Sequence, residues 1–192
     1  FHPAINRAMN VKQIPNAITL ARMVAALPLL YFLIEDNALV SFWIAMLAGL
    51  SDSIDGYLAK KFDWRTALGG LLDPIADKLL LSVCFVGLAW QQAIPFWLCL
   101  LVLGRDVVIV SGAWVWWKTI GPFKPKPSWV SKLTTFFQIV YVGLLLADQA
   151  YAFVHPLILY SLFWLVIVFT IASGLDYFIR YGRRAMRVWR KE

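Results

Sequence analysis

Four aspartates at two helical spacings are the residues of this chain best suited to chemistry. Asp52 and Asp55 lie three residues apart, and Asp73 and Asp77 lie four residues apart. Residues at these spacings project from the same side of an α-helix. A short turn through residues 60–65 would bring the second helix back antiparallel to the first. We therefore expect the four carboxylates to converge on one small volume.

Carboxylates gathered inside a membrane need a compensating cation. An Asp in the middle of a membrane helix costs about 2.5–3.5 kcal/mol on insertion scales. Two like charges about 4 Å apart repel by roughly 4 kcal/mol at an effective dielectric constant near 20. Carboxylate oxygens with no His or Cys nearby suit a hard divalent ion. We expect Mg²⁺ or Mn²⁺ here, with two ions as the favoured number.

The elements that must position these acids are long apolar segments. The chain has 192 residues, of which 61% are hydrophobic and 15% are charged, a composition far more apolar than that of water-soluble domains. We predict an all-α membrane protein with a six-helix bundle, forming one domain over residues 1–192. Each predicted span is near the ~20 residues that a bilayer requires. The spans are 17–35, 38–59, 67–90, 94–118, 128–148 and 156–179.

Basic residues are confined to one side of this predicted bundle. The loops EDN, WQQAIP and ADQAYAFVHP contain no Lys or Arg, whereas the other connections and both ends are basic. The positive-inside rule then places both termini and the aspartates in the cytosol. We expect a bacterial inner membrane, or a mitochondrial inner membrane, as the location. The net charge of +7 needs no nucleic-acid partner, because these residues lie where anionic headgroups are.

The two ends of the chain suggest surface segments. Residues 1–16 are predicted to hold an amphipathic juxtamembrane helix, although a disordered end is an alternative. No cleavable signal peptide is expected, and Met9 is one candidate for the native start. Residues 180–192 form a basic tail, which is either an interfacial helix or only a topology anchor. Cys84 and Cys99 fall in apolar spans and are expected to be buried rather than bonded.

Polar residues in the first span lie on one helical face. Asn16, Thr19 and Arg22 follow each other at intervals of three residues. We predict that they line a polar cavity and bind the donor substrate, with Arg22 donating to a phosphate or to a carboxylate. The alternative for Arg22 is a side chain that reaches back to the membrane interface.

Two further cations are candidates for binding an acceptor phosphate. Arg105 precedes Asp106 about halfway along the fourth span, and Lys132 lies near the start of the fifth. Arg105 either holds a substrate phosphate or forms a structural ion pair with Asp106. Lys132 either meets an acceptor phosphate or reaches the interface.

The central stretch resembles the signature of the CDP-alcohol phosphotransferase family, D-x2-D-G-x2-A-R-x8-G-x3-D-x3-D. The matching positions, at the same gaps, are Asp52, Asp55, Gly56, Ala59, Lys60, Gly69, Asp73 and Asp77. One position departs, because Lys60 stands where the family has Arg. Lys supplies a point charge without the planar fork, so bidentate contacts there are in question.

The resemblance implies a Mg²⁺- or Mn²⁺-dependent transfer of a phosphatidyl group from CDP-diacylglycerol to an alcohol, with release of CMP. It implies that Asp52, Asp55, Asp73 and Asp77 hold the metal and that Asp77 also acts as the general base. The nucleotide site would include Gly56, Ala59, Lys60 and Gly69. A homodimer among membrane lipids is a further expectation from the family.

The resemblance leaves two acceptors open. Four segments look more like eukaryotic-type cardiolipin synthases than phosphatidylglycerol-phosphate synthases: IPNAITLARM, ALGGLLDPIADKLLLS, GRDVVIV and KPSWVSKLTT. We therefore favour phosphatidylglycerol as acceptor and cardiolipin as product, with glycerol 3-phosphate as the alternative. Arg22, Arg105 and Lys132 would meet the acceptor phosphate.

Two other classes of function are alternatives to an enzyme. A cation-coupled transporter would also need intramembrane carboxylates, but the external halves of the spans offer no matching polar path. A non-catalytic scaffold would not explain four costly aspartates at these spacings. We therefore expect an enzyme.

Overall fold

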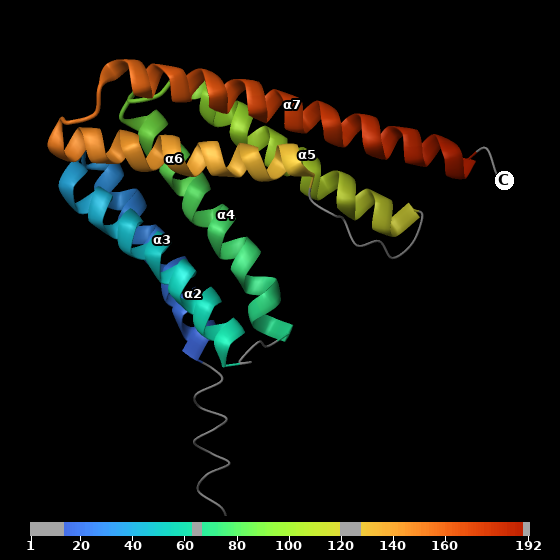
Figure 1. The fold of residues 1–192 in the computed structure, drawn as a ribbon, viewed down its shortest axis with the longest axis horizontal. Coiled ribbons are helices and arrows are strands. Elements are labelled where there is room, and N and C mark those ends of the chain that lie inside the picture. The colour runs from blue at the N-terminus through green and yellow to red at the C-terminus, as the bar shows by residue number, and fades with distance from the viewer. Residues whose placement is uncertain (1–13, 63–66, 120–127, 190–192) are drawn as a thin grey trace, which may run out of the picture. The chain divides into compact units, whose positions relative to one another are not determined.

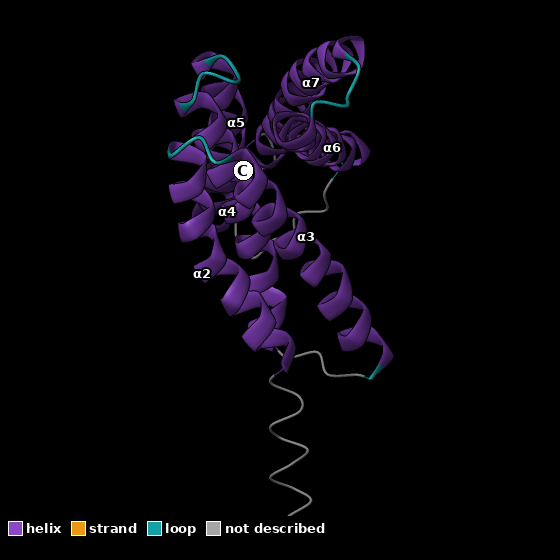
Figure 2. Cartoon of the chain, turned by 90° about the vertical axis from the view of Figure 1, so that its left-hand side faces the viewer, coloured by secondary structure: helices purple, strands orange, loops and turns teal. Residues whose placement is uncertain are grey.

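The structure is a computed structural model that describes residues 14–62, 67–119 and 128–189. Within these ranges it describes no side chains at 14–16, 52–61, 67–72, 74, 113–117, 119 and 180–189. Every described element is an α-helix (Figure 2). The all-α fold class is therefore confirmed for the described residues. The expected amphipathic helix at residues 1–16 lies mostly outside them.

Six helices make up the described chain (Figure 1). They are α2 (Ile14–Ile34), α3 (Ala38–Lys61), α4 (Ala67–Trp90), α5 (Phe96–Thr119), α6 (Trp129–Tyr151) and α7 (Pro156–Trp189). By their contacts the residues fall into two compact units: residues 1–93 with 146–153, and residues 94–145 with 154–192.

In the first unit, α2 packs against both α3 and α4. Figure 1 shows α3 and α4 running in opposite directions, with the end of α3 and the start of α4 at the same end of this unit. A tight turn joins α2 to α3: Asp36 has a positive φ of 57°, and the Asn37 Oδ1 accepts a bond from the Val40 amide at 3.3 Å. Asp and Asn are suited to these positions, the first to a left-handed backbone and the second to a helix N-cap.

The core of the first unit follows a stripe along α2. Ala26, Leu29 and Leu33 are buried at intervals of three and four residues, the spacing of one helical face. Helix α4 approaches α2 closely at Gly87, where an added Cβ would lie 2.6 Å from the Cβ of Leu33. This face of α2 is therefore fixed against α4 at its C-terminal end.

The second unit brings together α5, α7 and most of α6. Helices α5 and α7 pack against each other. Two polar contacts join α6 to α7: the Thr134 hydroxyl donates to the Phe169 carbonyl at 2.9 Å, and the Gln138 amide donates to the Thr170 hydroxyl at 3.2 Å. Such bonds between helices satisfy polar groups that hydrocarbon would leave unpaired.

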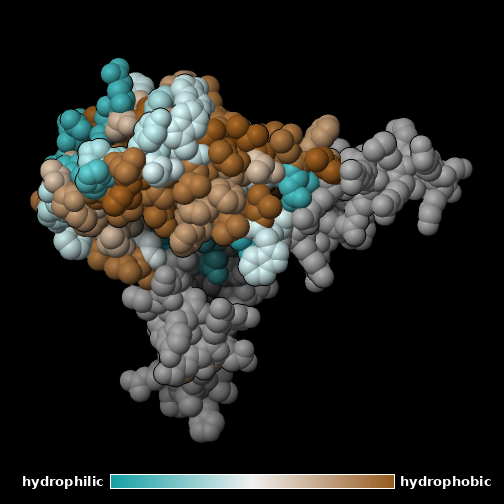
Figure 3. Space-filling model, turned by 45° about the horizontal axis from the view of Figure 1, so that its top comes forward, coloured by the Kyte–Doolittle hydropathy of each residue, from teal (hydrophilic) through white to brown (hydrophobic). Residues whose placement is uncertain are grey.

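Three helices in the described part of the chain are long and apolar enough to cross a membrane. They comprise Ala17–Ile34, Trp129–Tyr151 and Pro156–Ile179. Hydrophobic residues also cover most of the described surface in the view of Figure 3. These features are consistent with an integral membrane protein, while the count of six spans and the side of the termini stay predictions.

The last helix is longer than the predicted span. We expected the span to end at residue 179, but α7 continues without interruption to Trp189. No proline follows Pro156 within it, and Arg, Ala and Met are good helix formers. The basic tail is thus helical as far as residue 189.

Candidate active site

The buried face of α2 turns polar toward its N-terminus. Thr19 and Arg22 continue the stripe of Ala26, Leu29 and Leu33, and both are buried. The opposite face of α2 is apolar and exposed, as expected for a surface in contact with lipid: Leu20, Val24 and Leu27. The polar end of the α2 stripe must therefore be satisfied within the protein.

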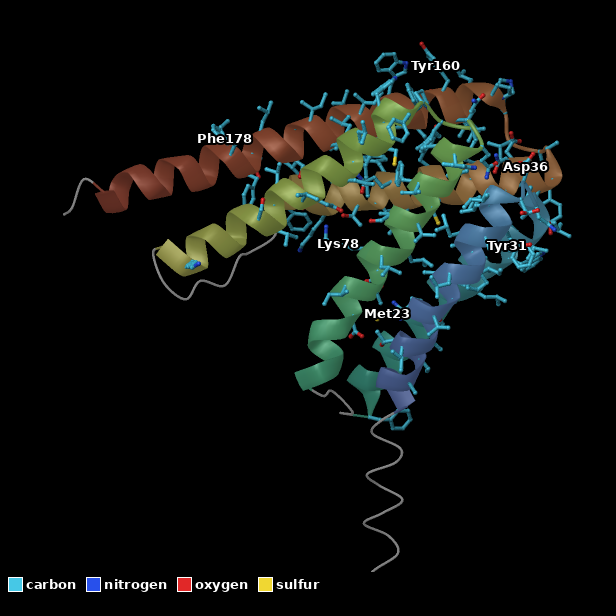
Figure 4. The ribbon with its side chains drawn as sticks, turned by 180° about the vertical axis from the view of Figure 1, so that it is seen from behind. Met23, Tyr31, Asp36, Lys78, Tyr160 and Phe178 are labelled. Atoms are coloured by element: carbon cyan, nitrogen blue, oxygen red, sulfur yellow. The ribbon has the colours of Figure 1, made fainter. Side chains whose placement is uncertain are left out.

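Two carboxylates of α4 accept hydrogen bonds from the polar residues of the α2 stripe. The Thr19 hydroxyl donates to the Asp73 Oδ1 at 2.9 Å. The Arg22 Nη1 donates to the Asp77 Oδ1 at 2.5 Å, which also makes an ion pair. Figure 4 labels Met23 on α2 and Lys78 on α4, which directly follow Arg22 and Asp77 in the chain. Of the alternatives that the sequence left for Arg22, the structure contains the bond to a carboxylate.

The two members of this ion pair differ in exposure. The Arg22 side chain is 1% exposed, whereas the Asp77 side chain is 51% exposed. A buried guanidinium is costly unless a carboxylate accompanies it. The Asp77 carboxylate thus compensates the buried Arg22 while about half of its own side chain stays exposed.

The oxygen ligands at this site fit a hard divalent cation. Asp73 and Asp77 share one face of α4 and offer only carboxylate oxygens, which suit Mg²⁺ or Mn²⁺. Among the described side chains, no group of three or more His, Cys, Asp or Glu residues could hold a metal. The Asp52 and Asp55 side chains fall outside that set. Their helix, α3, ends at Lys61, close along the chain to the start of α4 at Ala67.

Several predicted site residues lie outside the described side chains. The backbone places Asn16 in the first turn of α2, and Gly69 in the first turn of α4. The others lie in the last turns of α3: Asp52, Asp55, Gly56, Ala59 and Lys60. Their roles stay predictions.

In the second unit, Arg105 is the centre of a buried polar cluster. Its Nη1 donates to the Asp106 Oδ1 at 2.6 Å, and its Nη2 donates to the Ser131 hydroxyl at 2.6 Å. Both Nε, at 3.0 Å, and Nη2 donate to the Ser173 hydroxyl. The guanidinium thus links α5, α6 and α7. The structural ion pair with Asp106 is present, and the role toward an acceptor stays a prediction.

Lys132 directly follows Ser131 of the Arg105 cluster, but its side chain lies in a different environment. It is exposed, and its Nζ lies 4.9 Å from the centre of the Trp129 ring. A cation over an indole face is attracted by the ring quadrupole. Lys132 therefore sits beside an aromatic residue of the type found at membrane interfaces.

Sequence reasoning missed Ser173 as a partner of Arg105. The residue lies in an otherwise apolar stretch of α7, three residues after Thr170 and on the same face. Both are buried. Two hydroxyl residues at this spacing were the available signal for a polar contact between helices.

Comparison with known proteins places these residues in a family. The family model described as CDP-alcohol phosphatidyltransferase matches residues 12–177. A human protein named cardiolipin synthase (CMP-forming) is 31% identical over 191 residues, which cover 91% of this chain and 63% of that protein. The chain thus spans less than two thirds of the length of this relative.

Two bacterial relatives carry a different name, CDP-diacylglycerol–glycerol-3-phosphate 3-phosphatidyltransferase. The protein of Aquifex aeolicus is 34% identical over 140 residues, which cover 69% of this chain and 76% of that protein. The protein of Rickettsia bellii is 30% identical over 173 residues, with 87% and 94% covered. The family match spans both compact units and includes the Asp73–Asp77 pair of α4. The chain belongs to the CDP-alcohol phosphatidyltransferase family.

Proposed function

We propose that this protein transfers a phosphatidyl group from CDP-diacylglycerol to the hydroxyl of phosphatidylglycerol, giving cardiolipin and CMP. The observation that carries the proposal is the pair Asp73 and Asp77 on one face of α4, held by Thr19 and Arg22 of α2 in a chain of this family. Carboxylates in a membrane protein are costly and mark functional sites by default.

A divalent cation is part of this proposal. Asp52, Asp55, Asp73 and Asp77 would hold Mg²⁺ or Mn²⁺, as one ion or two. The ion would neutralise charge on the diphosphate of the donor. This choice is supported by the oxygen-only ligands that α4 contributes and by the general metal dependence of the family.

The protein's own residues would act as the general base and bind the nucleotide. The half-exposed Asp77 carboxylate would accept the proton of the acceptor hydroxyl, because a weakly nucleophilic alcohol needs a base. The acceptor oxygen would bond to the phosphatidyl phosphorus while the bond to the CMP oxygen breaks. The nucleotide would be bound by Asn16, Thr19, Gly56, Ala59, Lys60 and Gly69.

A second acceptor, glycerol 3-phosphate, is favoured by a specific observation. The relatives from Aquifex aeolicus and Rickettsia bellii, at 34% and 30% identity, are named for that acceptor. We keep phosphatidylglycerol as the first candidate because of the segments quoted from the sequence. Arg105 and Lys132 would meet the phosphate of either acceptor.

The membrane arrangement is also proposed. We place six spans in a bacterial or mitochondrial inner membrane, with both termini and the active site facing the cytosol, as the charge asymmetry of the loops indicates. Residues 1–192 would act as one catalytic domain, assembled as a homodimer.

The testing experiment measures CMP release by the purified full chain in lipid nanodiscs. CDP-diacylglycerol and Mn²⁺ are supplied with either phosphatidylglycerol or glycerol 3-phosphate. We expect CMP and cardiolipin with the first acceptor and little product with the second. The reverse preference would overturn the proposed acceptor. Absence of CMP with either acceptor would overturn the proposed transferase activity.

A matched control distinguishes an effect at the site from the effect of removing any one negative charge. Asp73→Asn is compared with Asp36→Asn, because Asp36 lies exposed in the α2–α3 turn and Asn tolerates its positive φ of 57°. We expect Asp73→Asn to abolish CMP release and Asp36→Asn to leave it unchanged.

A further inference from the structure

The contact between Arg22 and Asp77 has an electrostatic consequence beyond packing. Two carboxylates, Asp73 and Asp77, share one face of α4 and repel each other. The Arg22 guanidinium touches only the second of them in the described contacts, at 2.5 Å, while the first receives the neutral Thr19 hydroxyl at 2.9 Å. Among the described contacts, a cation therefore offsets the charge of Asp77, and a neutral hydroxyl meets that of Asp73.

The charge of Arg22 acts strongly on Asp77 because the arginine is buried. The Arg22 side chain is 1% exposed, so water screens its charge little. It belongs to a stripe that continues into the apolar core as Ala26 and Leu29. The arginine is therefore the buried member of the pair, and Asp77 is the half-exposed one.

We infer that Arg22 is the charge-compensating and positioning partner of Asp77. It holds one carboxylate oxygen of Asp77 and offsets the repulsion between Asp73 and Asp77 before a divalent cation binds. Arg22 acts through Asp77 and does not bind a substrate phosphate. The inference rests on the proposed function for its metal, whereas the ion pair itself is independent of it.

The variants follow from this contact. Arg22→Gln removes the charge, and Arg22→Lys keeps it. Asp77→Asn removes the partner, and the double variant Arg22→Gln/Asp77→Asn removes both. Leu20→Ala, on the exposed face of the same helix, is the matched control.

The first measurement is metal binding by the full chain in nanodiscs, with Mn²⁺ followed by electron paramagnetic resonance and unfolding followed by tryptophan fluorescence. Without Arg22 the site around Asp73 and Asp77 carries one positive charge fewer, so we expect Arg22→Gln to bind Mn²⁺ about tenfold or more tightly. Its midpoint of unfolding should fall without Mn²⁺ and recover when Mn²⁺ is added. Arg22→Lys and Leu20→Ala should behave as the wild type does.

The second measurement is turnover. We expect Arg22→Gln to lower kcat about tenfold to a hundredfold, because an outer partner that orients a ligand is lost. The KM for CDP-diacylglycerol should stay within about threefold, since no substrate contact is removed. In the Asp77→Asn background, Arg22→Gln should change Mn²⁺ affinity less than it does in the wild type, because its carboxylate partner is already neutral.

Three results would overturn the inference. Unchanged Mn²⁺ affinity with a raised KM would make Arg22 a phosphate ligand. Equal destabilisation with and without Mn²⁺ would make it purely structural. If the effects of Arg22→Gln and Asp77→Asn simply add in the double variant, Arg22 does not act through Asp77. If Arg22→Gln does not fold, the double variant should fold as well as Asp77→Asn, and failure there counts against the inference.

Failure of the inference and failure of the proposed function are distinguishable. Wild-type protein that binds Mn²⁺ and releases CMP keeps the function, whatever Arg22→Gln does. Wild-type protein that does neither loses the function, while the coupling of the Arg22 and Asp77 variants in unfolding without metal still tests the ion pair.

Discussion

Replacing Gly87 by alanine tests the packing that holds α2 beside α4. A Cβ at this position would lie 2.6 Å from both the Cβ and the Cδ1 of Leu33. The Cδ1 can move by a change of rotamer, but the Cβ is fixed to the backbone. The two helices must therefore separate, by roughly 1 Å if the carbons are to reach van der Waals contact.

The magnitude follows from two opposing terms. Overpacking of a well-packed site costs about 1–3 kcal/mol. Replacing a helical glycine by alanine returns about 0.5–1 kcal/mol. We expect a net loss of about 1–2 kcal/mol, which for a chain of this size lowers the midpoint of thermal unfolding by about 2–8 °C.

The assay is thermal unfolding in nanodiscs, with Gly49→Ala as the matched control. A Cβ at Gly49 on α3 would meet no atom within 4 Å in the described part of the chain. We expect that variant to be as stable as the wild type or slightly more stable. A Gly87→Ala protein as stable as Gly49→Ala would refute the close approach of α2 and α4.

Three further predictions concern the two polar sites. Asp77→Asn should abolish turnover and retain Mn²⁺-dependent binding of CDP-diacylglycerol in a filter assay, whereas loss of folding would make Asp77 structural. Ser173→Ala should lower the free energy of unfolding by about 1–3 kcal/mol, because the buried Arg105 loses an acceptor. The exposed Ser161→Ala should change it by less than about 0.5 kcal/mol, and equal effects would contradict this. Removal of divalent cations with EDTA should stop CMP release and Mn²⁺ should restore it, whereas activity in EDTA would exclude the metal.

The positions of the helices could be predicted well from the sequence. The fourth helix was expected at 67–90 and is observed as Ala67–Trp90. Polar and turn-forming residues bound the apolar segments, so each segment has a clear beginning and end. The exception is α7, where no helix-breaking residue separates the apolar span from the basic tail.

The partners of the polar side chains could be predicted only in part. The spacing of Thr19 and Arg22 fixes the face of α2 on which they lie, but not which helix meets that face. Their contacts with Asp73 and Asp77 depend on how α2 and α4 are rotated about their axes, which burial of Ala26, Leu29 and Leu33 determines. The Ser173 contact with Arg105 was missed for the same reason. One serine in an apolar helix does not reveal its partner.

The most direct test of the account is the location of the metal. Crystals of the full chain with Mn²⁺ and CDP-diacylglycerol would give an anomalous-scattering map of the manganese. We predict peaks within about 2.5 Å of carboxylate oxygens from Asp52, Asp55, Asp73 and Asp77, beside the diphosphate of the donor. Manganese bound elsewhere, or a diphosphate held by basic side chains with no manganese near these four residues, would contradict the account.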